Sequence, residues 1–230
     1  MTIENNLSHI RHMVADVTTI RPVTLLAVSK TFEVDAIEEA VAAGQLAFGE
    51  NYVQEGVEKI HYFKQKYPSV PIEWHMIGPI QSNKTKLVAE NFDWVQSIDR
   101  EKIASRLSAQ RPDNMSDLNV LIEVNVDEQE SKSGVNIDEV ELLLEKIMAL
   151  PKLRVRGLMC IPNPDLPLEQ KKCSFQKMRT LFDELNAKGY PFDVLSMGMS
   201  ADFQEAIRQG ATLVRVGSAI FGARDYSKKS

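Results

Sequence analysis

The sequence LLAVSKTFE, residues 25–33, joins a short apolar run to the start of a helical pattern, and it decides the fold prediction. The apolar run predicts a buried strand that ends at Lys30, and a helix is predicted to follow over Val34–Ala43. A lysine at the inner end of a buried strand is unusual, because an ammonium group is costly to remove from water without a partner. Lys30 is therefore the first candidate functional side chain. The alternative is a lysine that leaves the sheet and extends into solvent.

The same strand-then-helix unit recurs along the chain. The predicted strands are Thr24–Ser29, Leu46–Glu50, Glu73–Gly78, Trp94–Ile98, Asn119–Val126, Arg154–Ile161, Val194–Met199 and Thr212–Ser218. The predicted helices are Val34–Ala43, Val53–Lys66, Lys84–Glu90, Glu101–Ala109, Ile137–Leu150, Leu168–Ala187 and Ala201–Gln209, with an extra helix within Thr2–Val17. Eight such units in 230 residues favour a single α/β domain over residues 1–230, a (β/α)8 TIM barrel with an extra N-terminal helix. A doubly wound sheet is the alternative, but no GxGxxG motif follows the first strand.

Composition and charge narrow the function classes. The net charge of -5 does not favour non-specific binding to nucleic acid. Cys160 and Cys173 form neither a CxxC pair nor a zinc spacing, and no His/Cys/Asp/Glu cluster has metal-ligand spacing. The first residues lack the apolar core of a signal peptide, and no apolar run has the length of a membrane span. We therefore expect a cytoplasmic protein with reduced cysteines, no metal, and no nucleic-acid or membrane partner.

Polar residues gather at the predicted strand ends, which form the active face of a (β/α)8 barrel. Lys30 ends the first strand, Asn51 follows the second, and His75 lies within the third. Lys132 follows the fifth strand and is either a second amine at the site or a surface-loop residue. For His75, the alternative to a ligand-binding role is a histidine whose partners all lie in the protein core.

The last two predicted strands carry the most specific pattern. Ser196, Gly198 and Ser200 alternate along the seventh strand, and Ser200 is predicted to cap the next helix. Gly217 and Ser218 end the eighth strand. The loops after strands 7 and 8 are a recurrent phosphate site in this fold, where glycine lets backbone N–H groups approach the anion and hydroxyls add donors. We therefore predict a phosphate site, with a plain helix cap and a packing glycine as the alternatives.

Arg215 lies two residues before Gly217, on the same face of the predicted strand. A guanidinium cannot lose its proton and needs a partner inside a barrel, and a pyridine nitrogen would be a suitable acceptor. Desolvation favours the neutral form of an amine such as Lys30, and a neutral amine condenses with an aldehyde. These features together lead to the hypothesis that Lys30 carries pyridoxal 5'-phosphate (PLP) as a Schiff base. For Arg215, the alternative is an ion pair near the barrel rim.

Six motifs in order carry a family resemblance. They are AVSKT (27–31), FGENY (48–52), WHMIG (74–78), QSNK (81–84), LSMGMS (195–200) and VRVGS (214–218). From about Leu25 to Tyr226, the chain closely resembles the pyridoxal phosphate homeostasis protein family, PLP-binding barrels of the alanine racemase N-terminal type. The resemblance implies a cytoplasmic, mostly monomeric protein that acts in vitamin B6 and amino-acid homeostasis. It also implies PLP on Lys30, Arg215 facing the pyridine nitrogen, and phosphate held by the Ser196–Ser200 segment with Gly217 and Ser218. Asn51 and His75 would line the pocket.

Two function classes remain open. The first is a PLP-binding protein without a defined turnover reaction, and the second is a small PLP-dependent amino-acid racemase or lyase. Racemases of this fold class carry a second, β-rich domain that helps to enclose the site, whereas this sequence ends about a dozen residues after the last predicted strand. We therefore expect a solvent-accessible site, which favours binding over proton transfer. A third interpretation is a phosphate-binding barrel enzyme without PLP.

Overall fold

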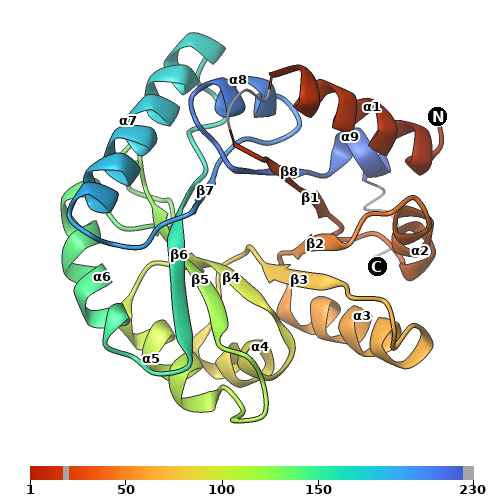
Figure 1. The fold of residues 1–230 in the computed structure, drawn as a ribbon, viewed down its shortest axis with the longest axis horizontal. Coiled ribbons are helices and arrows are strands. Elements are labelled where there is room, and N and C mark those ends of the chain that lie inside the picture. Colours follow the sequence, from red (N-terminus) through yellow and green to blue (C-terminus); the bar gives the residue numbers. More distant parts are fainter. Residues whose placement is uncertain (18–20, 225–230) are drawn as a thin grey trace.

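Eight parallel strands form a closed barrel in the order β1 to β8, which confirms the (β/α)8 prediction (Figure 1). The structure is a computed structural model that describes residues 1–17 and 21–224, so Tyr226, where the family resemblance ends, lies outside the described residues. β1 pairs with both β2 and β8, and this second pairing closes the barrel. The strands are β1 (Thr24–Val28), β2 (Ala47–Glu50), β3 (Glu73–Met76), β4 (Trp94–Ile98), β5 (Leu118–Val124), β6 (Leu153–Cys160), β7 (Val194–Ser196) and β8 (Leu213–Val216).

Helices form the outer layer around the strands (Figure 1). They are α1 (Ile3–Val17), α2 (Val34–Ala42), α3 (Val53–Lys66), α4 (Thr85–Asn91), α5 (Glu101–Gln110), α6 (Val140–Met148), α7 (Leu168–Ala187), α8 (Phe203–Arg208) and α9 (Ser218–Phe221). Short 3-10 helices at Ser82–Lys84 and Ile137–Glu139 precede α4 and α6. The extra N-terminal helix, α1, is confirmed. No helix in the described ranges is both long enough and apolar enough to cross a lipid bilayer.

The two faces of each strand are buried in different cores, because helices cover the barrel outside and side chains fill it inside. The outer core includes Phe48 and Trp74. The inner core includes Leu26 and Val28 of β1, packed with neighbours such as Leu213 of β8. Since alternate residues of a strand share a face, Leu26 and Val28 predict that the next residue of this series, Lys30, also belongs to the interior side.

The segment around β7 differs from its prediction. The predicted strand Val194–Met199 stops at Ser196, because Gly198 adopts a φ of +100°, which no regular strand allows. The next helix starts at Phe203, not at Ala201, and Asp202 precedes it. The side chain of Asp202 accepts a hydrogen bond from the backbone N of Met199 at 2.8 Å. The prediction that Ser200 caps this helix is therefore wrong: Ser200 lies in the turn that leads to it.

α1 covers the seam where the barrel closes. It packs against α2, α8 and α9, elements from opposite ends of the sequence that lie side by side in Figure 1. Leu7 and Ile10 bury their side chains there, and Asn6 Nδ2 donates a hydrogen bond to the backbone oxygen of Ile220 at 2.8 Å. This helix thereby supports α9, which begins at Ser218, one of the predicted phosphate residues.

Candidate functional site

Lys30 lies just beyond β1, at the carboxyl-terminal face of the barrel. It is half-buried, and its strand runs between β2, which leads to Asn51, and β8, which carries Arg215. In the β1–β8 register, Leu26 is level with Arg215, so Lys30 is four residues further toward the active face. The structure therefore brings these three predicted residues to neighbouring strands, as the order of the strands in the sequence predicts.

Arg215 is buried under the ends of β6 and β7. Its guanidinium donates hydrogen bonds to Ser196 Oγ at 2.6 Å and to the backbone oxygen of Cys160 at 2.9 Å. Burial lowers the pKa of Arg215 from its ordinary value. Within residues 1–17 and 21–224, no carboxylate forms a salt bridge with this guanidinium, and a guanidinium has five N–H donors. The site thus presents a buried cation with capacity for a further acceptor.

A chain of hydrogen bonds runs from Arg215 across the barrel interior. Ser196 Oγ donates to Gln96 Oε1 at 2.6 Å, and Gln96 Nε2 lies 2.9 Å from His75 Nδ1. His75 Nε2 lies 2.9 Å from Glu73 Oε1. Because a guanidinium can only donate, the direction of each bond follows: Gln96 donates to Nδ1, and the Nε2–H of His75 donates to Glu73.

His75 is fully buried, with both ring nitrogens engaged by protein groups. Burial lowers the pKa of His75 from its ordinary value, which favours the neutral ring that this hydrogen-bond pattern requires. The ring also stacks on Trp94, with centroids 4.9 Å apart and planes 7° from parallel. These contacts leave neither nitrogen for a ligand, so His75 can act on the site through Gln96 and Ser196.

The loops after β7 and β8 meet at the mouth of the barrel. The backbone N of Ala219 donates to Ser200 Oγ at 3.5 Å, which places Ser200 beside the start of α9. Gly217 packs closely on β1, since a Cβ built there would lie 3.2 Å from the backbone oxygen of Val28. Ser218 is exposed. The predicted phosphate residues therefore divide into two groups: Ser200, Gly217 and Ser218 gather at the mouth, whereas Ser196 belongs to the interior chain.

A cavity of about 780 Å³ opens on the carboxyl-terminal side of β2 to β4. Asn51 lines it together with Lys84, Asp99, Arg100 and Ser133. The Oδ1 atom of Asn51 is buried and accepts no hydrogen bond within the described part of the chain. An orphaned acceptor at the mouth of a barrel is the kind of atom that a ligand donor satisfies.

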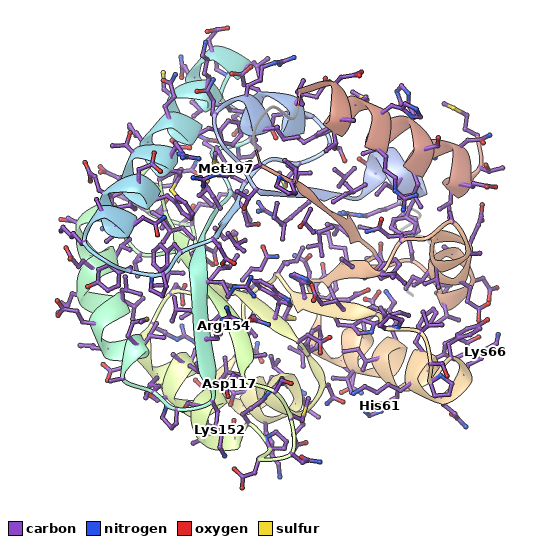
Figure 2. All side chains as sticks on the ribbon, in the orientation of Figure 1. His61, Lys66, Asp117, Lys152, Arg154 and Met197 are labelled. Carbon is purple, nitrogen blue, oxygen red and sulfur yellow. The ribbon has the colours of Figure 1, made fainter. Side chains whose placement is uncertain are left out.

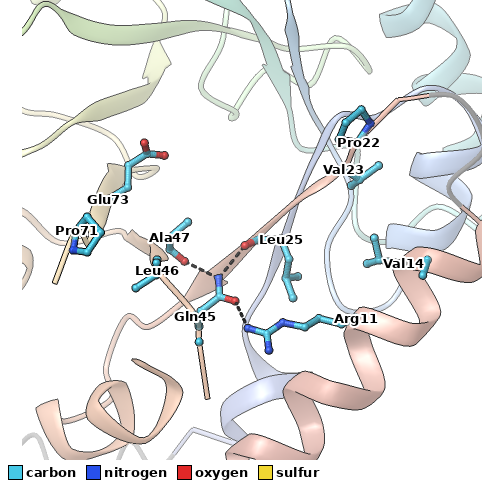
Figure 3. Close-up of a pocket in the computed structure, with 12 residues that line it drawn as sticks. Arg11, Val14, Pro22, Val23, Leu25, Gln45, Leu46, Ala47, Pro71 and Glu73 are labelled. Atoms are coloured by element: carbon cyan, nitrogen blue, oxygen red, sulfur yellow. Dashed lines mark hydrogen bonds between the residues drawn. The ribbon is translucent and has the colours of Figure 1, made fainter. Parts of the chain in front are cut away.

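A second cavity, of about 640 Å³, lies at the opposite end of the barrel (Figure 3). It is lined by the first residues of β1 to β3 and by α1. Gln45 spans it, donating to the backbone oxygens of Leu25 and Ala47 and accepting from Arg11. This is the amino-terminal face of the strands, which in such barrels serves stability.

Glu123 is a buried carboxyl of β5 that is not among the residues predicted from the sequence. Burial, together with repulsion from Asp99, raises the pKa of Glu123 to about 7, although the charge of Arg215 opposes the rise. Gln96 was also missed. Both interrupt apolar runs at inward-facing positions, the same signal that drew attention to His75, and that signal could have found them.

Two histidines on the outer helices, His61 and His12, lie away from this face. Figure 2 shows His61 on the outer side of α3, where its Nε2 atom lies 2.9 Å from Asn91 Oδ1. His12 is exposed on α1 and bonds the backbone oxygen of Ser8. Cys160 and Cys173 are both free thiols. Cys160 contributes its backbone oxygen to the site, as an acceptor for Arg215.

Comparisons with known proteins agree on one family. A family model described as alanine racemase, N-terminal domain, matches residues 2–225. A protein of Pasteurella multocida, named pyridoxal phosphate homeostasis protein, is 54% identical and covers 99% of this chain and all of its own. The protein of the same name from Escherichia coli K12 is 48% identical and covers 99% of both chains.

Solved structures resemble this one closely. The PipY protein of Synechococcus elongatus, solved with PLP bound, is 32% identical, has a TM-score of 0.84, and covers 96% of this chain and all of its own. An alanine racemase from Corynebacterium glutamicum is 17% identical with a TM-score of 0.72, and covers 99% of this chain but 62% of its own. The second likeness shows the shared fold alone.

Proposed function

This chain belongs to the alanine racemase N-terminal domain family and, within it, to the pyridoxal phosphate homeostasis proteins, and on that premise we propose that it binds PLP at Lys30 as a Schiff base. Its role is PLP and amino-acid homeostasis. The relatives that carry this premise match almost the full chain, and one solved relative holds PLP.

The observation that carries the proposal is the buried guanidinium of Arg215, on the strand next to that of Lys30 and without a carboxylate partner among the described residues. A buried cation that cannot lose its proton needs an acceptor or an anion. The buried Oδ1 of Asn51 has the opposite requirement, because it is an acceptor without a donor among the described residues. Both needs fit a cofactor that carries a ring nitrogen, a hydroxyl and a phosphate.

Each site residue would make a different contact with the cofactor. Lys30 supplies the amine, and the cofactor supplies an aldehyde that condenses with amines. Ser200, Gly217 and Ser218, brought together at the mouth, would hold the phosphate. Arg215 would face the pyridine nitrogen, and Asn51 would accept a hydrogen bond from the ring. Ser196 would hold Arg215 directly, and His75 would support Ser196 through Gln96.

Arg215 also bears on whether turnover follows binding. An always-charged donor keeps a pyridine nitrogen unprotonated, which makes the ring a weaker electron sink than one paired with a carboxylate. The site geometry therefore favours binding over amino-acid chemistry. Incubation with several amino acids followed by chiral chromatography tests this: turnover that vanishes in Lys30→Ala would establish a racemase or lyase instead.

The family resemblance extends the proposal to a single barrel domain over residues 1–230, monomeric and cytoplasmic, with amino acids as further small-molecule partners. Sedimentation of the purified protein and fractionation of cells test the oligomeric state and the compartment.

Borohydride trapping with peptide mapping tests the covalent bond. Protein saturated with PLP should be yellow, and reduction should fix the label on the peptide that contains Lys30. Lys132→Ala is the control, because it removes a loop lysine that precedes Gly134 and leaves β1 intact. A label on another lysine would refute the role of Lys30. A colourless protein that binds phosphate but no PLP would support a phosphate-binding barrel of another kind.

A further inference from the structure

Lys30 lies within a tight turn, Ser29-Lys30-Thr31-Phe32. The turn is closed by a hydrogen bond of 3.1 Å from the backbone N of Phe32 to the backbone oxygen of Ser29. Thr31, its third residue, has a φ of 69°. Glycine or asparagine usually occupies a left-handed position of this kind, and a β-branched residue there is a genuine outlier. Such a conformation persists only where its surroundings fix it.

Two side chains of α3 hold the peptide groups on either side of Lys30. Glu55 Oε1 accepts a hydrogen bond from the backbone N of Thr31 at 2.6 Å. Lys59 Nζ donates to the backbone oxygen of Ser29 at 2.8 Å. Glu55 and Lys59 are four residues apart and therefore share one face of the helix. One helix thus holds the strained turn on both sides of Lys30.

Lys59 connects these contacts into a buried cluster. Its Nζ atom also donates to Glu50 Oε1 and to Glu55 Oε1, each at 2.8 Å, so three acceptors match the three donors of an ammonium. Glu50 Oε1 accepts from Ser29 Oγ at 2.6 Å as well. The side chains of Lys59 and Glu50 are 6% and 0% exposed. A buried ion pair adds little net stability, and its best-attested use is to specify one geometry.

We propose that Glu55 and Lys59 are positioning residues, which hold the turn around Lys30 in the one conformation that can capture the cofactor. The inference rests on the proposed function of Lys30. A protein whose binding-competent conformation is only partly populated binds more weakly by that fraction. The cluster keeps nearly all protein molecules in the binding-competent conformation of the turn. Neither Glu55 nor Lys59 is assigned a contact with the cofactor.

Variants of Glu55 test the proposal, because Glu55 lies at the edge of the cluster and its loss leaves the Lys59–Glu50 pair intact. In Glu55→Ala, the backbone N of Thr31 loses its acceptor. We expect affinity for PLP to weaken about tenfold, since a hydrogen bond to a charged group contributes about that factor. Hydrogen exchange at the Thr31 amide of the cofactor-free protein should accelerate by about the same factor. Glu55→Gln keeps an oxygen acceptor without the charge and should restore part of both values.

Glu58→Ala is the matched control, since Glu58 is an exposed glutamate on the same helix and should behave as wild type. Unchanged affinity in Glu55→Ala would overturn the proposal. Weaker affinity with unchanged exchange at Thr31 would also overturn it, because the loss would then arise elsewhere. Borohydride mapping separates this result from failure of the proposed function: if Lys30 is not the cofactor lysine, the wild-type protein itself shows no label there.

Discussion

At the scale of single residues, the barrel interior contains two ionisable side chains, Glu123 and Arg215. The pKa of Glu123 rises from 4.5 to about 7, because desolvation and repulsion from Asp99 outweigh attraction to Arg215. Between pH 4.5 and 7 the folded protein therefore holds this proton more tightly than the unfolded chain does. Stability falls as pH rises through that window, and the loss is complete above pH 7.

Replacement of the carboxyl by an amide should remove this dependence. The quantity to compare is the free energy of unfolding of Glu123→Gln minus that of wild type. We expect this difference to be about 3 kcal/mol larger at pH 8 than at pH 4, because a rise in pKa of this size corresponds to that free energy. Urea unfolding of both proteins across the pH range measures the difference. Parallel pH profiles for the two proteins would show that Glu123 does not hold its proton in the folded state.

Strand periodicity predicted where side chains point but not what they contact. Alternation along β8 predicts that Arg215 points into the barrel, and its hydrogen bonds to Ser196 and Cys160 agree with this. His75 was predicted to line the pocket, but the structure shows both of its nitrogens bonded to Glu73 and Gln96. Glu73 lies two residues before His75 on the same strand face, a spacing that strand alternation does contain, whereas Gln96 comes from β4, and no local pattern encodes its approach to His75.

At the scale of elements, local signals fixed most boundaries. The prediction for α3, Val53–Lys66, and for α7, Leu168–Ala187, matches the structure residue for residue, because each helix has a clear apolar stripe and a clear stop. β7 was predicted three residues too long. Its end depends on the left-handed backbone of Gly198, which is set by packing against α8.

Gly198 and Gly189 form a matched pair, since both adopt a φ of +100°. A Cβ at Gly198 would lie 2.6 Å from the Cβ of Ala206 and 3.0 Å from the Cα of Phe203, whereas nothing lies within 4 Å of a Cβ at Gly189. We expect Gly189→Ala to cost about 1–2 kcal/mol from backbone strain and Gly198→Ala about 3 kcal/mol or more, because overpacking adds to it. Urea unfolding compares them, and equal losses would contradict the packing argument.

At the scale of the whole molecule, the proposed site lies on the seam where the barrel closes. Lys30 follows β1, the first strand, and Arg215 lies on β8, the last, and these two strands pair directly. α1 covers the same seam from outside and bonds to α9 through Asn6. A ligand that contacts both strand ends therefore joins the two ends of the sequence, and its binding opposes the opening of the barrel.

Because PLP would bind only the folded barrel, it should stabilise the protein by mass action. At a concentration one hundred times the dissociation constant, binding adds about 2.7 kcal/mol, which for a chain of this size raises Tm by about 5–10 °C. Lys30→Ala should show a smaller rise than wild type at the same PLP concentration. Pyridoxine 5'-phosphate, which keeps the phosphate but lacks the aldehyde, should give wild type and Lys30→Ala the same small rise. Equal rises in Tm with PLP in both proteins would mean that the covalent bond to Lys30 does not stabilise the closed barrel. The stabilisation would then come from the phosphate residues after β7 and β8 alone.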